Sequence, residues 1–142
     1  MNLKSLMTAK PACCIPQTAL RVVAHLMKER DCGLIPVVDA LDTLKPIGTI
    51  TDRDIAIRIV AAGRNPAEAT AADCMSSPCV TIEADRSLRE CCELMEAHML
   101  RRILVVDDDG QLCGIVALAD VAHSGHEATT VDLLKVVSQP AR

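Results

Sequence analysis

Two stretches of seven residues with the same outline are the strongest constraint on how this chain can fold. Residues 48–54 read GTITDRD and residues 114–120 read GIVALAD, and each begins with Gly and ends with Asp. The sequence before them repeats as well, because IPVVD at 35–39 corresponds to ILVVD at 103–107. At an offset of 67 or 68 residues, order and spacing agree over about 55 residues, so the sequence indicates an internal duplication.

Each copy begins with the same pattern. A short apolar segment comes first, at 12–15 and 79–82, and a helix follows it. In that helix apolar residues recur at i, i+3, i+4 and i+7, which predicts one buried face. These residues are Leu20, Val23, Ala24 and Met27 in the first copy, and Leu88, Cys91, Cys92 and Met95 in the second. Thr18 and Ser87 are the expected N-caps of the two helices.

Two strands and a second helix complete each copy. The expected strands are 34–39 and 46–51 in the first copy, and 102–107 and 112–117 in the second. The turn DDDGQ joins the second pair, with Gly110 available for a positive φ. The second helix is predicted to begin near Asp52 and near Leu118, and in the first copy to end at Gly63.

The duplication predicts an α/β fold of the α+β type, in which two repeats each have a three-stranded sheet and two helices. The expected boundaries are 3–63 for the first repeat, 64–72 for a linker, 73–126 for the second repeat, and 127–142 for a C-terminal helix and tail. Because one such unit is too small to bury its sheet alone, the two repeats are expected to share a core.

Composition argues against several functional classes. Half of the 142 residues are hydrophobic, yet the chain has no Phe, Trp or Tyr that could stack on a nucleic-acid base. The net charge is −4 and no run of Lys and Arg exceeds two residues, which disfavours contact with a phosphate backbone. No apolar run approaches the ~18 residues that span a bilayer, and the start of the chain has no signal-peptide core. We therefore expect a cytoplasmic protein without nucleic-acid or membrane partners.

Eight cysteines and four histidines raise the question of a metal or redox site. The chain contains no Cys-x-x-Cys pair. Seven of the eight cysteines fall on an apolar residue of the other copy, and only Cys14 falls on a polar one, Thr81. Cysteines in such positions behave as small hydrophobes, so we predict reduced core thiols and no metal site. His123 and His126, with Glu127 beside them, are interpreted as exposed loop residues.

The Thr-x-x-Asp pattern of GTITDRD allows two interpretations. A strand that ends at Thr51 and opens a helix can present free backbone N–H groups to a phosphate, while Asp54 accepts hydrogen bonds from ribose hydroxyls. The same spacing fits a capping box, in which Thr51 and Asp54 satisfy each other's backbone N–H groups. In the second copy Ala117 replaces the Thr while Asp120 is kept. The kept carboxylate favours a ligand role, whereas the lost hydroxyl makes a phosphate harder to hold.

Taken in order, these motifs resemble a tandem pair of cystathionine β-synthase (CBS) domains, also called a Bateman module. The resemblance covers roughly residues 3–124. It is carried by the openings MTAKP and MSSP, the helices TALRVVAHLM and SLRECCELM, the strands IPVVD and ILVVDDDG, and the closing GTITDRD and GIVALAD. In that family the two domains pack with pseudo-two-fold symmetry, two clefts at their junction often hold adenosine ligands, and the modules commonly dimerise.

The resemblance also implies which residues contact a ligand. Thr51 would contact phosphate, Asp54 and Asp120 would hold ribose, and arginines would bind further phosphates. The candidate contact residues are Cys14, Ile15, Ile35, Pro36, Thr51, Arg53 and Asp54 in the first copy, and Val80, Thr81, Arg101, Arg102, Ile103 and Asp120 in the second. Because the first copy has Gly33 and Leu34 where the second has the two arginines, the two sites are expected to differ in charge.

The function that the resemblance implies is regulatory. We expect no catalysis and no obligatory cofactor, but a homodimeric module that binds AMP, ADP or ATP, with NAD or S-adenosylmethionine as less favoured ligands. Ligand binding would be signalled to an unidentified effector protein by a change in conformation or dimer packing. The alternative is a CBS pair that serves only for dimerisation or docking and binds no nucleotide.

Overall fold

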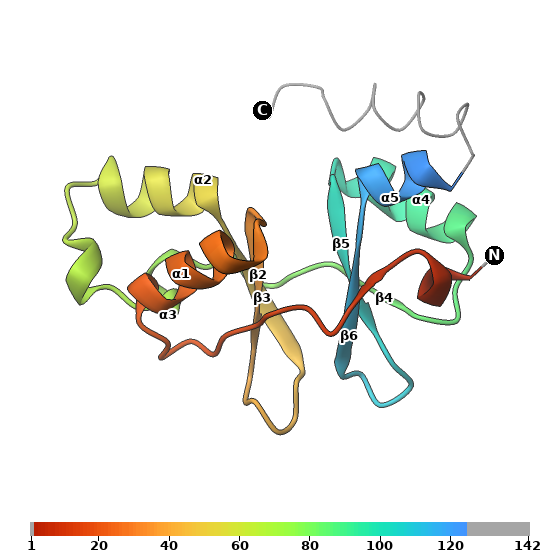
Figure 1. Ribbon diagram of the computed structural model, residues 1–142, viewed down its shortest axis with the longest axis horizontal. Coiled ribbons are helices and arrows are strands. Elements are labelled where there is room, and N and C mark those ends of the chain that lie inside the picture. Colours follow the sequence, from red (N-terminus) through yellow and green to blue (C-terminus); the bar gives the residue numbers. More distant parts are fainter. Residues whose placement is uncertain (1, 125–142) are drawn as a thin grey trace. The chain divides into compact units, whose positions relative to one another are not determined.

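The computed structural model describes residues 2–124, and these fall into two compact units (Figure 1). The first-repeat unit consists of residues 11–79. The second-repeat unit consists of residues 2–10 together with 80–124. The helix and tail expected at 127–142, and with them His126 and Glu127, lie outside the described residues. Each unit combines strands with helices, which confirms the predicted mixed α/β class.

A four-stranded sheet organises the second-repeat unit. Its strands are β1 (Thr8–Ala9), β4 (Thr81–Glu83), β5 (Arg102–Val106) and β6 (Leu112–Ala117), in the order β1-β6-β5-β4. β4 runs parallel to β5, and the other neighbours are antiparallel. The helices of this unit are η1 (a 3-10 turn, Leu3–Ser5), α4 (Leu88–His98) and α5 (Leu118–His123). The predicted buried face of α4 is confirmed, because all four of its apolar residues belong to the core.

The first-repeat unit follows the same plan. β2 (Leu34–Val38) and β3 (Pro46–Thr51) form an antiparallel hairpin. Cys14 adds a parallel bridge to Val37 on one side, and Ser76 adds an antiparallel bridge to Thr49 on the other. The helices are α1 (Leu20–Arg30), α2 (Asp52–Ile55), its π-helical continuation η2 (Ala56–Val60), η3 (a 3-10 turn, Pro66–Glu68) and α3 (Ala71–Cys74). On α1 the structure buries Leu20 and Val23, whereas Ala24 is exposed, contrary to the predicted face.

The two units exchange their first segments relative to the sequence repeats. In the second-repeat unit, β1 pairs with β6, although residues 8–9 belong to the first repeat. In the first-repeat unit, Ser76 exchanges two backbone hydrogen bonds with Thr49, of 3.0 and 2.8 Å, although residue 76 belongs to the second repeat. The segment expected as a linker, 64–72, is also part of the first-repeat unit, where Ala69 and Ala71 are buried in its core. The compact units are therefore offset from the expected boundaries.

This exchange explains why both seven-residue motifs begin with glycine. A Cβ on Gly48 would lie 2.6 Å from the carbonyl oxygen of Ser76, and a Cβ on Gly114 would collide with the side chain of Met7. Residues 76 and 7 belong to the two exchanged segments. Glycine at these positions lets each exchanged segment approach the last strand closely enough to form backbone hydrogen bonds.

Replacing Gly48 tests this close approach. We expect Gly48→Ala to lower the free energy of unfolding by about 1–3 kcal/mol, because the backbone of Ser76 must move away from β3. Gly33→Ala is the matched control, since the atom nearest to its new Cβ is a side-chain oxygen of Asp52, which can rotate. Urea denaturation of both variants measures the difference. Equal losses in the two variants would contradict the interpretation.

The parallel bridge of Cys14 corrects the alignment of the two copies in this segment. Cys14 pairs with Val37, and Ile82 pairs with Val105, so the structure makes Cys14 the counterpart of Ile82 and not of Thr81. Both residues are buried, at 2% and 5% exposure. Cys14 therefore matches an apolar residue, as expected of a buried cysteine that serves as a small hydrophobe, while the half-buried Cys13 takes its place opposite Thr81.

The predicted helix and turn signals hold with one exception. Ser87 caps α4 by accepting a hydrogen bond from the N–H of Glu90 at 3.1 Å. Gly63 and Gly110 both have positive φ, as predicted. Thr18 is not the N-cap of α1, because its hydroxyl accepts from the N–H of Ile15 at 3.1 Å and the cap position is Ala19. The side chain of Thr18 thus stabilises the turn before the helix instead of the helix itself.

An aspartate ends the first strand of each hairpin one residue earlier than expected. Oδ1 of Asp39 accepts hydrogen bonds from the N–H groups of Ala40 and Lys45, at 2.7 and 3.0 Å, and from the hydroxyl of Thr43 at 2.6 Å. Oδ1 of Asp107 accepts from two backbone N–H groups of the corresponding turn. The Asp of IPVVD and ILVVD therefore organises the hairpin turn and does not extend the strand.

The hydrogen bonds to Asp39 predict a titration effect. The Thr43 hydroxyl is the main group that holds the pKa of the Asp39 carboxyl below its ordinary value of 3.8, and the N–H groups of Lys45 and Ala40 act in the same direction. Because the pKa is lowered by folding, the carboxylate stabilises the folded state above pH 3.8, and this contribution is lost as the pH falls through the folded-state pKa. We expect Thr43→Ala to raise the pKa of Asp39, as measured by NMR titration of its carboxyl carbon. An unchanged pKa would contradict the assignment.

Candidate functional site

The β3–α2 junction of the first-repeat unit forms a reciprocal capping box. Oγ1 of Thr51 accepts a hydrogen bond from the N–H of Asp54 at 3.1 Å, and Oδ2 of Asp54 accepts one from the N–H of Thr51 at 2.9 Å. Both side chains are half-buried. The capping interpretation of Thr-x-x-Asp is therefore confirmed in its geometry.

The neighbouring backbone donors at this junction are also satisfied. The N–H of Asp52 donates to the carbonyl oxygen of Gly33 at 3.1 Å, and the N–H of Arg53 donates to Oδ1 of Asp52 at 2.8 Å. Together with the capping box, these bonds engage the N–H groups of residues 51 to 54. The free backbone donors that the sequence predicted for a phosphate are not present here, and the Asp52 carboxylate adds negative charge beside them.

The capping box still leaves two polar groups available. A threonine hydroxyl that accepts one hydrogen bond can donate another, and a carboxylate has two oxygens. Within residues 2–124, no hydrogen bond reaches Oδ1 of Asp54 and the Thr51 hydroxyl donates none. Capping and ligand contact are therefore compatible at this junction, with one donor and one acceptor left for a ligand hydroxyl.

The β6–α5 junction of the second-repeat unit has fewer side-chain caps on its backbone N–H groups. Oδ2 of Asp120 accepts from the N–H of Ala117 at 2.7 Å, so the backward bond of the aspartate is kept without a Thr partner. The N–H of Leu118 donates to the carbonyl oxygen of Arg101 at 2.8 Å. No side chain of the described residues accepts from the N–H groups of Ala119 and Asp120, whereas at the first junction Asp52 and Thr51 serve the corresponding groups. The alanine that replaces the capping Thr thus offers no side-chain acceptor to the N–H of Asp120.

Two arginines stand beside this second junction. Arg102 pairs with Ala117 across the sheet, and the backbone of Arg101 bonds to the first residue of α5. Both side chains are exposed. The corresponding residues of the first-repeat unit are Gly33 and Leu34, which contact the start of α2 in the same way. The first junction carries Asp52, Arg53 and Asp54, whereas the second carries two arginines and one aspartate, so their net charges are −1 and +1.

The predicted apolar contact residues are divided between the cores and the surface. Ile35, Ile103 and Cys14 are almost completely buried in the cores of their own units, so their side chains support the fold. Pro36 is also buried, and its carbonyl oxygen accepts from the N–H of Cys14 at 3.0 Å. The three remaining residues are accessible at least in part. These are Ile15 and Val80, which are half-buried, and Thr81, which is exposed.

Two features of the site were missed by sequence reasoning. The carboxylate of Asp52 bonds to the next backbone N–H and closes the first junction to an anion. The N–H groups at residues 119 and 120 have no side-chain cap among the described residues, which favours the second junction over the first for an anion. Ala117 carried the signal for the second feature, because a residue without a side-chain acceptor cannot cap the N–H three residues later.

The cysteines show no sign of activation. Burial, with a smaller contribution from the neighbouring thiols of Cys13 and Cys92, respectively, raises the pKa of the Cys14 and Cys91 thiols to about 12. Burial is also the main cause of the raised pKa of Cys74. A raised pKa keeps these sulfurs protonated, and the protonated thiol is neither a good nucleophile nor a metal ligand. Among the described residues, no group of three His, Cys, Asp or Glu side chains is placed to hold a metal ion.

The chain belongs to the CBS-domain family. A family model described as "CBS domain" matches residues 3–61 and 71–127, which confirms the tandem pair. Hypoxic response protein 1 of Mycobacterium tuberculosis is 34% identical over 137 residues, or 96% of this chain and 94% of that protein. The uncharacterized protein MK0525 of Methanopyrus kandleri is 41% identical over 105 residues, or 74% of this chain, and the match spans only about half of that protein, 52%.

Solved structures share the fold. A crystal structure of Hypoxic Response Protein I with two coordinated zinc ions superposes with a TM-score of 0.76 at 33% identity, covering 87% of this chain and 98% of that one. A structure of CBSX2 in complex with AMP has a TM-score of 0.72 at 21% identity, covering 89% and 97% of the two chains. Within residues 2–124, no helix is long and apolar enough to cross a membrane.

Exchanging the cap residues of the two junctions tests how they differ. We expect Thr51→Ala to lower the free energy of unfolding by about 1 kcal/mol, because the N–H of Asp54 loses its acceptor. Ala117→Thr should raise the free energy of unfolding by a similar amount, since the new hydroxyl can accept from the N–H of Asp120. Chemical denaturation measures both changes. A lower free energy of unfolding in Ala117→Thr would contradict the expectation that a hydroxyl at residue 117 caps the N–H of Asp120.

Proposed function

We propose that this CBS-domain pair is a regulatory module that binds an adenosine nucleotide, AMP, ADP or ATP, and signals its presence to an effector protein. The observation that carries the proposal is the aspartate at the same strand–helix junction of both units, each with one carboxylate oxygen that bonds to no described residue. A carboxylate at such a junction, with one oxygen still able to accept, suits a ribose hydroxyl. The AMP bound by CBSX2, which shares the fold, supports the choice of ligand class.

The second-repeat unit is the better place for the phosphate. The N–H groups of Ala119 and Asp120, which no described side chain caps, can donate to phosphate oxygens, and the exposed guanidinium of Arg102 brings the positive charge that a phosphate requires. In the first-repeat unit a phosphate would have to displace the Asp52 carboxylate from the N–H of Arg53. We infer that a nucleotide at the first junction would be held through its ribose by Asp54, with no phosphate site beside it.

The mechanism of signalling would be a shift in populations. A nucleotide stabilises whichever conformation binds it more tightly, and it can shift an equilibrium only by that difference in affinity. A homodimer, as the family resemblance implies, would convert this preference into a change of its packing that an effector recognises. NAD and S-adenosylmethionine contain the same adenosine group and remain less favoured ligands.

A docking module without a physiological nucleotide is the second candidate. One observation favours it, namely that every backbone N–H from residue 51 to residue 54 is already engaged within the protein. A junction that is closed in this way needs no ligand to complete its hydrogen bonds. The two candidates differ in whether any nucleotide binds at millimolar concentration.

Calorimetric titration with AMP, ADP, ATP, NAD and S-adenosylmethionine separates the candidates. We expect saturable binding of an adenine nucleotide by the wild type. Asp120→Asn should weaken it at least about tenfold, because the amide still accepts from the N–H of Ala117 but presents an NH2 group to the ribose. Arg102→Ala should weaken ATP more than adenosine, and Asp54→Asn is the matched variant of the other junction. Absence of binding by the wild type would overturn the proposal in favour of the docking module.

A further inference from the structure

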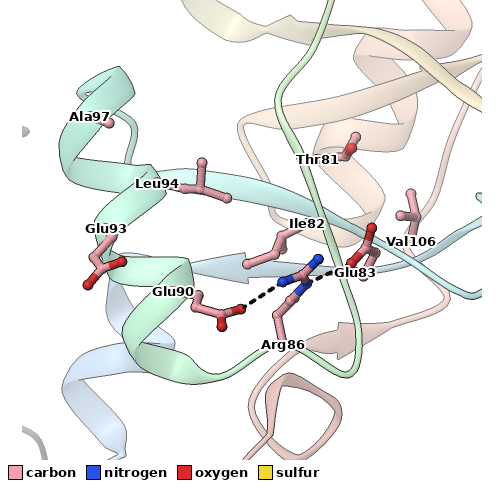
Figure 2. Close-up of a pocket in the computed structure, with 9 residues that line it drawn as sticks. All are labelled: Thr81, Ile82, Glu83, Arg86, Glu90, Glu93, Leu94, Ala97 and Val106. Atoms are coloured by element: carbon pink, nitrogen blue, oxygen red, sulfur yellow. Dashed lines mark hydrogen bonds and ion pairs between the residues drawn. The ribbon is translucent and has the colours of Figure 1, made fainter.

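A groove opens between β4 and α4 within the second-repeat unit (Figure 2). Its volume is about 480 Å³, and Ile82 of β4 and Leu94 and Ala97 of α4 give it an apolar side. Three glutamates and one arginine also line it, so its charged side chains sum to −2. These charged residues are Glu83, Arg86, Glu90 and Glu93. The groove therefore combines an apolar surface with an excess of negative charge.

β4 is the outermost strand of its sheet, and all three of its residues line the groove. It pairs with β5 on one side, and no strand within residues 2–124 pairs with its other side. The N–H of Ala84, just after the strand, donates to the carbonyl oxygen of Val106 in β5 at 2.9 Å. Because successive peptide groups of a strand point to opposite edges, the N–H groups of Thr81 and Glu83 point away from β5. β4 thus presents backbone donors to a further strand.

An arginine of the chain itself shows how this groove holds a guanidinium. Nε of Arg86 lies 2.7 Å from Oε2 of Glu83, and its Nη1 lies 3.7 Å from Oε2 of Glu90 (Figure 2). Glu93 forms an ion pair with Arg89 at 3.3 Å. All of these side chains are at least about half exposed, and ion pairs of this kind are weak in water. The glutamates therefore remain accessible to a cationic side chain of another molecule.

The acidic groove is particular to the second repeat. The strand pairing that makes Cys14 the counterpart of Ile82 also aligns the first residues of the two long helices, Leu20 and Leu88. In this alignment the first repeat has no acidic residue at the positions of the three glutamates. It has Ile15, Val22 and His25 there. The framework of the repeat thus forms without these carboxylates, and their charge instead decides what the surface attracts.

We propose that the β4–α4 groove is the docking site for an extended, basic segment of a partner protein. The segment adds a strand to the outer edge of β4 and accepts hydrogen bonds from the N–H groups of Thr81 and Glu83. Its side chains alternate between the two faces of the sheet. On the α4 side an apolar side chain packs on Leu94, and a basic one two residues away reaches Glu90. A second basic side chain, on the opposite side, reaches Glu83, and the two together balance the charge of the groove.

Charge decides which kind of strand can pair with β4. A second copy of β4 would bring its own Glu83 against this one, and like charges opposite each other in a sheet are destabilising. An acidic or a purely apolar segment would leave the glutamates of the groove without a counter-charge. The proposal does not depend on nucleotide binding, because none of these glutamates belongs to the two strand–helix junctions.

NMR titration of the isotope-labelled full chain with short synthetic peptides tests the proposal. The basic peptides have the sequences TSVRRTS and TSRRVTS, so that both strand directions are offered, and the acidic peptide TSVEETS is their control. We expect a basic peptide to bind at millimolar concentration or below, and to slow hydrogen exchange at the N–H groups of Thr81 and Glu83, because these groups gain an acceptor. TSVEETS should not bind.

Charge reversal separates the groove from the rest of the surface. Glu90→Lys with Glu93→Lys should weaken binding of the basic peptide at least about tenfold and allow TSVEETS to bind. Asp108→Lys with Asp109→Lys is the matched control, because it changes the net charge by the same amount at exposed positions of a turn in the same unit. It should leave binding unchanged. Circular dichroism verifies that each variant is folded.

Three results would overturn the proposal. The first is a wild type that binds neither basic peptide at millimolar concentration. The second is an equal loss of affinity in the groove variant and in the turn variant, because only the overall charge would then matter. The third is binding that leaves hydrogen exchange at Thr81 and Glu83 unchanged, since no strand would then be added to β4.

Discussion

The exchange of backbone hydrogen bonds between the first segment of one repeat and the last strand of the other is the constraint on which both sheets depend. Thr49 and Ser76 donate to each other's carbonyl oxygens, and Thr8 takes the corresponding place opposite Ile115. Cut at a repeat boundary, each half would lose a segment that covers its outer strand, and an uncovered strand edge pairs with other chains. The two repeats therefore depend on each other, and the glycines at the start of GTITDRD and GIVALAD make this dependence possible.

The retained aspartates are explained first by the backbone and only then by a ligand. Asp54 and Asp120 each accept a hydrogen bond from the N–H three residues earlier, and Asp73 does the same for Thr70 at 2.8 Å. The start of a short helix needs such an acceptor whether or not a ligand is present. The two junctions differ in how many of the backbone N–H groups at the start of the helix are capped by a side chain. At the first, every donor is engaged. At the second, Ala117 and Leu118 offer no side-chain acceptor to the N–H groups of Ala119 and Asp120, and two arginines lie nearby.

Local patterns predicted local structure well, and they failed where partners distant in sequence or competing side chains decide. The hairpins, the two long helices, the cap at Ser87 and the positive φ at Gly63 follow from patterns within a few residues. The exchange of segments could not be predicted from such local patterns. In the sequence, the strand that receives an exchanged segment is marked only by its glycine, Gly48 or Gly114. At the candidate site, the capping box could be predicted from its spacing. The bond from Asp52 to the next N–H could not, since the same carboxylate is equally able to face solvent.

Comparison of the two copies separates residues that serve the fold from residues free to specialise. Asp39 and Asp107 organise equivalent turns, and both repeats keep them. The copies differ in charge at positions outside the cores: the alignment pairs Gly33 with Arg101 and Lys28 with Glu96. Differences of charge at exposed positions cost little stability but decide which ion or surface is attracted. Two junctions of opposite charge cannot bind the same anionic ligand equally. A nucleotide would therefore occupy the second-repeat unit first, and the response of the module would be asymmetric even though its framework is duplicated.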